Sequence, residues 1–427
     1  MRFLRLHSFG ALALSAVVAP SVAVADELPG GWDVEDLRRV PETRRWDRSS
    51  HLQTRSVLIR NGQFRGKQTW AFAHYGVPIQ ADVRHKVPAI VLVHGALGTA
   101  YASWVATWVQ RGYAAICVDT CGALPVRTAE GTWLRNPEGG PAGWGRLDAV
   151  DEPVNEQWMH HAVAAVVRSH SFIRSLPEVD DSCVGITGIS WGAVLACVVA
   201  SIDNRFAYAI PVYGCGFNCT SPDGIMVRGE NSGRPDASRK WFDLWDPAVY
   251  LSRAECPFLW VDGTNDHAFR LESVHRSADL VQGPGAFTTI TRMVHSHGVY
   301  GENPPEILAF ADHYARGGAD IVRFTRVESV HGRLTAGFAA NGRTISRAEL
   351  VYTEDDAIVP SADRYWKTLC VERFDATSGI VSIAVPPAAR LHFLNLVTYD
   401  GLVFSSRLFA VELAEARVAE VRKGRLD

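Results

Sequence analysis

A serine between two glycines is the feature of this sequence that most strongly suggests chemistry. The segment GISWG, residues 188–192, has the pattern G-x-S-x-G, with a β-branched apolar run before it and an alanine-rich run after it. Where a strand turns sharply into a helix at such a pentapeptide, the serine hydroxyl stands clear at the top of a sheet. The pattern therefore predicts that Ser190 is a nucleophile that attacks a carbonyl carbon.

A serine hydroxyl needs a base to accept its proton and an acid to orient that base. In this kind of fold the chain order is serine, acid, histidine. The turn after the run PFLWVD presents Asp266, which we expect to be the acid, with Asp262 as the alternative nearer the strand end. The loop after the next apolar run holds two histidines. We expect His297 to be the base because it lies further past the strand and precedes a glycine, and His295 is the alternative base.

The oxyanion of such a reaction needs preorganised N–H donors. The residue after the nucleophile, Trp191, would supply one backbone N–H. The turn HGALG, residues 94–98, follows an earlier strand-like run and would supply the second donor from Ala96 or Leu97. His94 precedes the serine in the chain, so we expect a structural role for it.

The elements that position these residues follow from the apolar runs between residues 55 and 318. Strand-like runs such as AIVLVHG and AAICVDT alternate with segments of helical periodicity. This alternation is typical of a mostly parallel sheet with helices on both faces, here with about eight strands. The fold class predicted for residues 26–318 is therefore α/β, as a catalytic domain with the α/β-hydrolase fold.

After the pair Gly317-Gly318 the rhythm changes to short strand-like runs separated by Gly, Asn, Asp and Pro. Runs that recur at roughly 10 to 15 residues without intervening helices are typical of a β-sandwich. We therefore expect an immunoglobulin-like β-sandwich domain with a charged tail over residues 319–427. The sequence leaves its role open, since glycan binding, contact with a partner and cover for a hydrophobic face all fit.

The first 25 residues have the pattern of an export signal. Arginines precede an apolar stretch, and Ala23 and Ala25 fit an A-x-A cleavage site,. We expect cleavage before Asp26 and a bacterial protein that is periplasmic or secreted, with no membrane segment afterwards; an uncleaved anchor is the alternative.

Composition limits the partners and cofactors of the chain. A net charge of −3 with dispersed positive residues excludes the basic footprint that nucleic acid requires. The pairs Cys117/Cys121 and Cys215/Cys219 are C-x-x-x-C motifs, a spacing that fits zinc poorly. We expect structural thiols or disulfides, no metal and no cofactor, and the oligomeric state stays open.

Two insertions follow strands near the expected site. The loop 122–154 is too long to be only a connection, and Trp133, Trp144 and the following Trp158 could form a platform for a sugar or aryl ring, or could pack in the core. A second insertion covers residues 218–246. Together they predict a covered pocket for a small-molecule or carbohydrate ester.

Several motifs resemble a known group. VLVHG, GISWGA, GTNDHAF and HSHG, together with PVYGCGF and AELVYTEDD, make the chain similar to secreted bacterial α/β-hydrolases of the dienelactone hydrolase and acetyl xylan esterase-like group. The resemblance implies a serine carboxylic-ester hydrolase with a Ser-His-Asp triad that removes acetyl or another short acyl group. A serine exopeptidase with the same triad is the alternative, and a non-catalytic glycan-binding protein is a further one.

Overall fold

The computed structural model describes residues 28–46, 54–145, 147–219, 224, 233–356, 358–372, 374 and 378–410. The predicted export signal, the charged tail and much of the second insertion lie outside the described residues. No helix within the described ranges is long and apolar enough to cross a membrane.

One large mixed sheet organises the molecule, in the order β1-β2-β3-β5-β4-β8-β9-β10-β11 for its first part. Its strands are β1 Thr43–Trp46, β2 Arg55–Phe64, β3 Lys67–Gly76, β4 Val87–Val93, β5 Ala114–Val118, β8 Val179–Ile189, β9 Tyr208–Val212, β10 Phe258–Gly263 and β11 Gly285–Ile290. Neighbours from β5 to β11 run parallel, and β1, β2 and β3 pair antiparallel at one edge. The parallel strands β4, β5, β9 and β10 are buried on both faces, which is why they read as continuous apolar runs.

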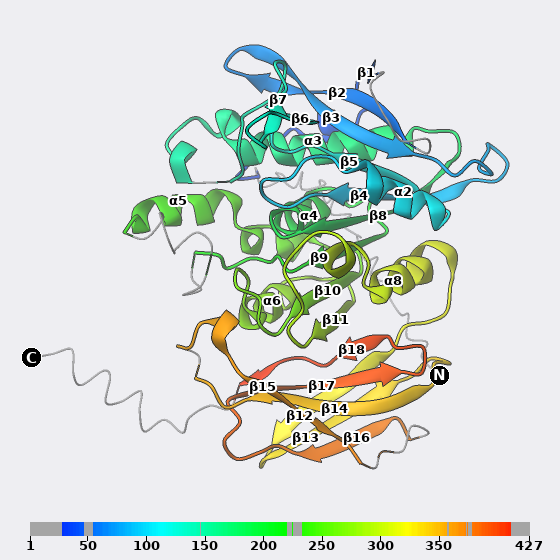
Figure 1. Ribbon diagram of the computed structural model, residues 1–427, viewed down its shortest axis with the longest axis vertical. Helices are drawn as coiled ribbons and strands as arrows, with labels where there is room; N and C mark the ends of the chain where they lie inside the picture. The colour runs from blue at the N-terminus through cyan, green and yellow to red at the C-terminus, as the bar shows by residue number, and fades with distance from the viewer. Residues whose placement is uncertain are drawn as a thin grey trace, which may run out of the picture.

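Helices cover both faces of this part of the sheet (Figure 1). They are α1 Val34–Leu37, α2 Ala102–Gln110, α3 Trp158–Arg174, α4 Trp191–Ile202, α5 Pro235–Trp245, α6 Leu271–Ala278, α7 Val299–Glu302 and α8 Pro305–Arg316. Along β4, Val91 packs in the same core cluster as α3 and α4, whereas Ile90 and Leu92 pack in the cluster of α2 and α8. This alternation follows from the two-residue period of a strand. The expected sheet with helices on both faces is confirmed.

The long loop after β5 carries a short two-stranded sheet of its own, made of β6 Ala123–Arg127 and β7 Trp133–Arg135. The hydrogen-bonded pair fixes the position of Trp133 at the start of β7. The loop is therefore an ordered structure rather than only a connection.

Helix α8 ends at Arg316, and Gly317 closes it in the left-handed conformation that glycine favours,. The chain then forms antiparallel strands: β12 Arg323–Val330, β13 Arg333–Ala339, β14 Ile345–Thr353, β15 Trp366–Cys370, β16 Ile380–Ala384, β17 Leu391–Thr398, β18 Val403–Ser405 and β19 Phe409–Ala410. β12, β13 and β16 form a small separate sheet. Leu334 of β13 and Leu350 of β14 belong to one apolar cluster, so the small sheet packs on the strands of the larger one. An immunoglobulin-like topology stays a prediction.

The sequence predicted a β-sandwich, in which these antiparallel strands would form two sheets of their own. The structure differs. β18 pairs antiparallel with β11, where Phe287 lies opposite Ser405, so the large sheet continues through β18, β17, β14 and β15. Figure 1 shows these strands directly beyond β11. An edge strand with unpaired N–H and C=O groups is a liability, and this pairing covers the β11 edge. We call residues 319–410 the C-terminal unit.

Candidate active site

Ser190 occupies a strained turn between β8 and α4. Its φ is 57° and its ψ is −119°, a conformation that a residue with a side chain adopts only when its surroundings enforce it. Glycine is required at Gly192, where a Cβ would lie 2.0 Å from the Val93 carbonyl oxygen. A Cβ at Gly188 would lie 2.1 Å from the Gly192 carbonyl oxygen. The pentapeptide therefore has the local structure of a nucleophile elbow.

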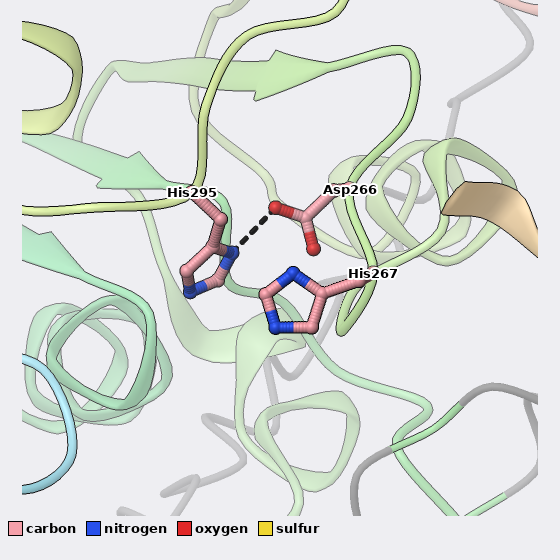
Figure 2. A group of neighbouring side chains, drawn as sticks. All are labelled: Asp266, His267 and His295. Atoms are coloured by element: carbon pink, nitrogen blue, oxygen red, sulfur yellow. Dashed lines mark hydrogen bonds and ion pairs between the residues drawn. The ribbon is translucent and has the colours of Figure 1, made fainter. Parts of the chain in front are cut away.

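Asp266 follows β10 and has its carboxylate fully hydrogen-bonded. Oδ1 accepts from the backbone N–H groups of Ala268 and Phe269, each at 2.8 Å. Oδ2 lies 2.5 Å from Nδ1 of His295 (Figure 2). The Asp266 side chain is 1% exposed, so water competes little for this contact. A charge-assisted hydrogen bond of this length fixes the ring and tautomer of the histidine.

The alternative acid, Asp262, lies in β10 and points into a different environment. Its Oδ1 accepts from the Gly263 N–H at 2.7 Å, and its Oδ2 has no hydrogen-bond partner among the described residues. Burial, followed by the charge of Asp266, raises the pKa of the Asp262 carboxyl well above its usual range. A carboxyl held neutral does not stabilise an imidazolium, so the geometry favours Asp266 as the acid.

The two histidines of the loop have different partners. His295 contacts Asp266 and packs on the Tyr213 ring with centroids 4.3 Å apart. His297 has Nδ1 3.0 Å from a Glu302 carboxylate oxygen, and its Nε2 accepts the Gly95 N–H at 3.0 Å. The acid therefore meets His295, the alternative base, and not His297, the base that we expected from the sequence.

A backbone feature accounts for this difference. Arg292, two residues after β11, has a φ of 55°, and this left-handed residue reverses the chain at once. His295 already stands clear of the strand end and over the Asp266 turn, while His297 is carried on toward the turn at residues 94–98.

His297 nevertheless lies close to the serine. A Cβ added at Gly95 would be 3.4 Å from both the Ser190 Cβ and the His297 Nε2. The Nε2 lone pair already accepts an N–H, and the Nδ1 proton is directed at Glu302. His297 therefore has no free nitrogen for the serine proton and instead holds the 94–98 turn.

The expected oxyanion donors lie on two elements beside Ser190. Trp191 is the first residue of α4, so its N–H has no acceptor within the helix. Leu97 has a φ of 60°, and the turn is closed by a Gly98 N–H to Gly95 C=O bond of 3.2 Å. The Trp133 indole N–H donates to the Leu97 carbonyl at 2.9 Å. Trp133 and His297 thus fix this turn from two directions, with the Ala96 and Leu97 amides between their contacts.

His94 is a buried structural residue, in agreement with expectation. Its Nδ1 lies 2.7 Å from the Gly95 carbonyl oxygen, and its Nε2 accepts the Thr120 N–H at 3.0 Å. Burial lowers the pKa of His94 to about 4. A neutral ring with both nitrogens engaged supports the start of the turn.

The three tryptophans proposed as a platform have different surroundings. Trp133 contacts the 94–98 turn, whereas the Trp144 and Trp158 rings lie 5.5 and 5.9 Å from the ring of Trp191. Trp158 is only 6% exposed and donates to the Thr120 carbonyl at 2.7 Å, which makes it a packing residue. Trp144 and Trp158 line a cavity of about 680 Å³ beneath the long loop.

Among the residues that the structure describes, one group of side chains has the spacing of a metal site. Ligand atoms of Asp266, His267 and His295 all lie within 4.8 Å of one another (Figure 2). Two of the three already form the short Asp–His hydrogen bond, so a metal ion would have to displace its proton. The eight cysteines are all free thiols, so neither expected cysteine pair is bridged.

Sequence reasoning missed Glu302 and Asn265. Glu302 lies five residues after His297, at the end of α7, and this short spacing is a local signal for a pair. Asn265 precedes the acid, and its contacts are to residues 361–364. No local pattern gives those partners.

Comparisons with known proteins found two family models that match parts of the chain. Residues 34–220 match the family model described as acetyl xylan esterase (AXE1), and residues 148–316 match the prolyl oligopeptidase family. No curated protein matches the chain.

Three similar solved structures illustrate the likeness. An acetyl xylan esterase from Paenibacillus sp. R4 is 19% identical with a TM-score of 0.52, over 69% of this chain and 96% of that chain. Acetyl xylan esterase 1 from Thermoanaerobacterium sp. JW/SL YS485 is 13% identical with a TM-score of 0.49, over 65% and 92%. An acylaminoacyl peptidase from Pyrococcus horikoshii is 16% identical with a TM-score of 0.47, over 64% and 44%.

The mixed sheet with its covering helices and the first of these structures show that the chain has the α/β-hydrolase fold. The family match and the strained serine then make the identification more specific. The chain is an acetyl xylan esterase-like serine hydrolase.

Proposed function

We propose that the chain is a serine esterase that removes acetyl or another short acyl group from a carbohydrate or a small alcohol. Ser190 is the nucleophile, His295 the base and Asp266 the acid. The observation that carries this proposal is the 2.5 Å contact between Asp266 and His295, which follow β10 and β11 of the same sheet whose strand β8 leads to Ser190.

The chemistry follows from this arrangement. His295 takes the Ser190 proton on Nε2 as the serine oxygen attacks the ester carbonyl, and Asp266 stabilises the resulting imidazolium. The Trp191 N–H and an N–H of the 94–98 turn hold the oxyanion. Collapse of the intermediate expels the alcohol, which takes the proton from His295. Water then attacks the acyl-enzyme by the same route and releases the acid.

A carbohydrate alcohol is supported by the aromatic surroundings of the serine. Trp133 is half-buried and its indole is fixed to the turn that carries the oxyanion donors. Its ring also lies near the Tyr101 ring, with centroids 6.4 Å apart. The Arg127 guanidinium lies 3.5 Å from the centroid of the Trp133 ring and covers one face, so the other face is the one that fits the C–H face of a sugar ring. Action outside the cytoplasm accords with the export pattern of residues 1–25 and remains a prediction.

A serine exopeptidase is the second candidate function. The match of residues 148–316 to the prolyl oligopeptidase family supports it. An amide passes through the same tetrahedral intermediate as an ester, so the triad alone does not separate the two activities. A substrate test is needed.

The test compares 4-nitrophenyl acetate, butyrate and octanoate with acetylated xylo-oligosaccharides and with aminoacyl 4-nitroanilides, for the chain from Asp26 and for Ser190→Ala. We expect the highest kcat/KM with acetyl esters and loss of turnover in Ser190→Ala. Faster cleavage of the anilides would replace the esterase by the peptidase. Glycan binding without any turnover would favour the alternative that the chain is a non-catalytic glycan-binding protein.

A further inference from the structure

The Asn265 side chain points away from the catalytic histidine and into the C-terminal unit. Its Nδ2 lies 2.7 Å from the Arg364 carbonyl oxygen, 3.2 Å from that of Ala362 and 3.3 Å from that of Ser361. Its Oδ1 accepts the Thr264 hydroxyl at 2.9 Å. A carboxamide has two N–H donors, so these carbonyls engage both. The short helix η6, Ser361–Asp363, therefore presents a row of acceptors to the residue before Asp266.

Thr264 extends this contact to the loop of the base. The Arg292 N–H donates to the Thr264 hydroxyl oxygen at 3.0 Å, and the Thr264 N–H donates to the Ile290 carbonyl at 3.1 Å. Arg292 is the left-handed residue that turns the chain toward His295. One chain of hydrogen bonds thus runs from the 361–364 carbonyls through Asn265 and Thr264 to the start of the histidine loop.

The segment after Asp266 is also held by the C-terminal unit. Leu271, at the start of α6, is 1% exposed and packs in an apolar cluster with Trp366 and Phe393. The next residue, Glu272, lies 2.7 Å from the guanidinium of Arg364, whose side chain is fully buried. Figure 1 shows the orange segment of the C-terminal unit beside α6. Contacts on both sides of Asp266 therefore come from the C-terminal unit, which follows it far along the chain.

We propose that the C-terminal unit is part of the catalytic apparatus, because its 361–364 turn positions the catalytic acid through Asn265. Asn265 is a positioning residue: it touches neither the substrate nor the reacting atoms, and acts by fixing the turn that aims Asp266 at His295. This inference rests on the proposed function, since it takes Asp266 as the acid of the triad. It assigns the C-terminal unit a role that glycan binding alone would not require.

The expected effect follows from the precision that the Asp–His contact needs. A shift of about 1 Å in a catalytic group can cost about 100-fold in rate. Removal of the carboxamide frees the turn on one side, while Ala268 and Phe269 still hold Oδ1 on the other. We therefore expect a partial loss of kcat of about 10- to 100-fold, with KM within about twofold because no substrate contact is removed.

The experiment measures kcat, KM and the pH profile of kcat/KM for the full chain and for Asn265→Ala, Asn265→Asp and Asn265→Ser. Asn265→Asp keeps the shape but replaces the donors by a carboxylate facing carbonyls, so we expect it to be at least as impaired as Asn265→Ala. The acid limb of the profile should shift in all three, because it reports the base that Asp266 orients. A purely structural role would lower stability without moving this limb.

Asn395→Ala is the matched control. Asn395 also joins the two units, through Nδ2 to the Thr289 carbonyl at 3.2 Å, but it has no contact with the acid turn among the described residues. We expect it to lower the melting temperature and to leave kcat within about twofold.

Two results would overturn the inference and leave Asp266 as the acid. One is equal loss of kcat in Asn395→Ala and Asn265→Ala, which would indicate general docking of the units. The other is wild-type kinetics in Asn265→Ala and Asn265→Asp beside an inactive Asp266→Asn, which would reject the positioning role and keep the proposed function. Full activity of Asp266→Asn would instead reject the assignment of the acid and the inference with it. If Asn265→Ala does not fold, Asn265→Ser carries the same comparison.

Discussion

The choice between His295 and His297 as the base is the sharpest test of the site. His295→Ala removes the imidazole that contacts Asp266, and His297→Ala removes the one that contacts Gly95 and Glu302. If His295 is the base, the first substitution should abolish turnover of 4-nitrophenyl acetate, and the second should only reduce it.

The losses of kcat that we expect for these two variants differ widely. Loss of a triad histidine costs about 10⁶-fold in kcat, or roughly 8 kcal/mol at about 1.4 kcal/mol per tenfold. His297→Ala leaves the Gly95 N–H without its acceptor. A neutral hydrogen bond contributes about 1 kcal/mol, so a loss of roughly five- to tenfold is expected. The two variants should differ by at least about 10³-fold in kcat.

The paired carboxylates provide the matched control. Asp266→Asn should lower kcat by about 10⁴-fold through the wrong histidine tautomer, whereas Glu302→Gln should behave like His297→Ala. Rates are measured at pH 8 with Ser190→Ala as the baseline. A His297→Ala variant as slow as Ser190→Ala, beside a His295→Ala variant that keeps a tenth of the wild-type rate, would show that His297 is the base and that the resting contact with Asp266 is not the catalytic one.

Three further predictions concern the turn, the pH dependence and metal ions. Gly192→Ala should destabilise the protein by more than about 3 kcal/mol and abolish turnover, because the new Cβ would lie 2.0 Å from the Val93 carbonyl oxygen. Thermal unfolding and kcat measure these two effects. A variant with the wild-type kcat would contradict the prediction. Burial lowers the pKa of His170 from 6.5 to about 4. At pH values between these two, the unfolded chain binds a proton at this residue and the folded chain does not. The stability of the fold is therefore present near pH 7 and is lost as the pH falls. Urea unfolding at pH 7 and pH 5 should show that His170→Asn loses about 2 kcal/mol less than the wild type over this interval; equal losses would contradict the assignment. Zn²⁺ should inhibit esterase turnover reversibly by replacing the proton between Asp266 and His295, with His267 as the third ligand. His267→Ala should keep its turnover and raise the inhibitory Zn²⁺ concentration at least about tenfold, whereas unchanged inhibition would place the ion elsewhere.

The sequence predicted the elements whose signals are local. The strands β4, β8 and β10 are buried on both faces and read as apolar runs, and G-x-S-x-G marks Ser190 because only glycine fits beside its strained backbone,. Asp266 followed from its place in a turn after β10. In each case the physical cause acts over a few residues, so a single sequence displays it.

The features that the sequence did not predict depend on contacts between distant segments. The pairing of β18 with β11 joins Ser405 to Phe287, and nothing in either short run specifies the other. The choice of His295 depends on a φ of 55° at Arg292. An arginine rarely adopts this left-handed conformation, so its residue type does not predict it. The partners of Asn265 are backbone carbonyls, which every residue has and which therefore leave no mark in a sequence.

The place where the C-terminal unit joins the sheet fits the positioning role that we propose for it. The acid and the base follow β10 and β11, and β11 would be the last strand of the sheet without β18. Strand edges and the loops beyond them have the fewest neighbours and open most easily. Ser190 needs no such support, since β8 lies in the middle of the sheet and α4 is buried along its whole length. Strands added at the β1 edge would not contact the loops that carry the acid and the base. Strands added at the β11 edge place backbone carbonyls against Asn265 and a buried arginine against Glu272. In the triad that we propose, the serine is fixed by its own strand and helix, whereas the turn that carries the acid contacts the unit that follows it in the chain.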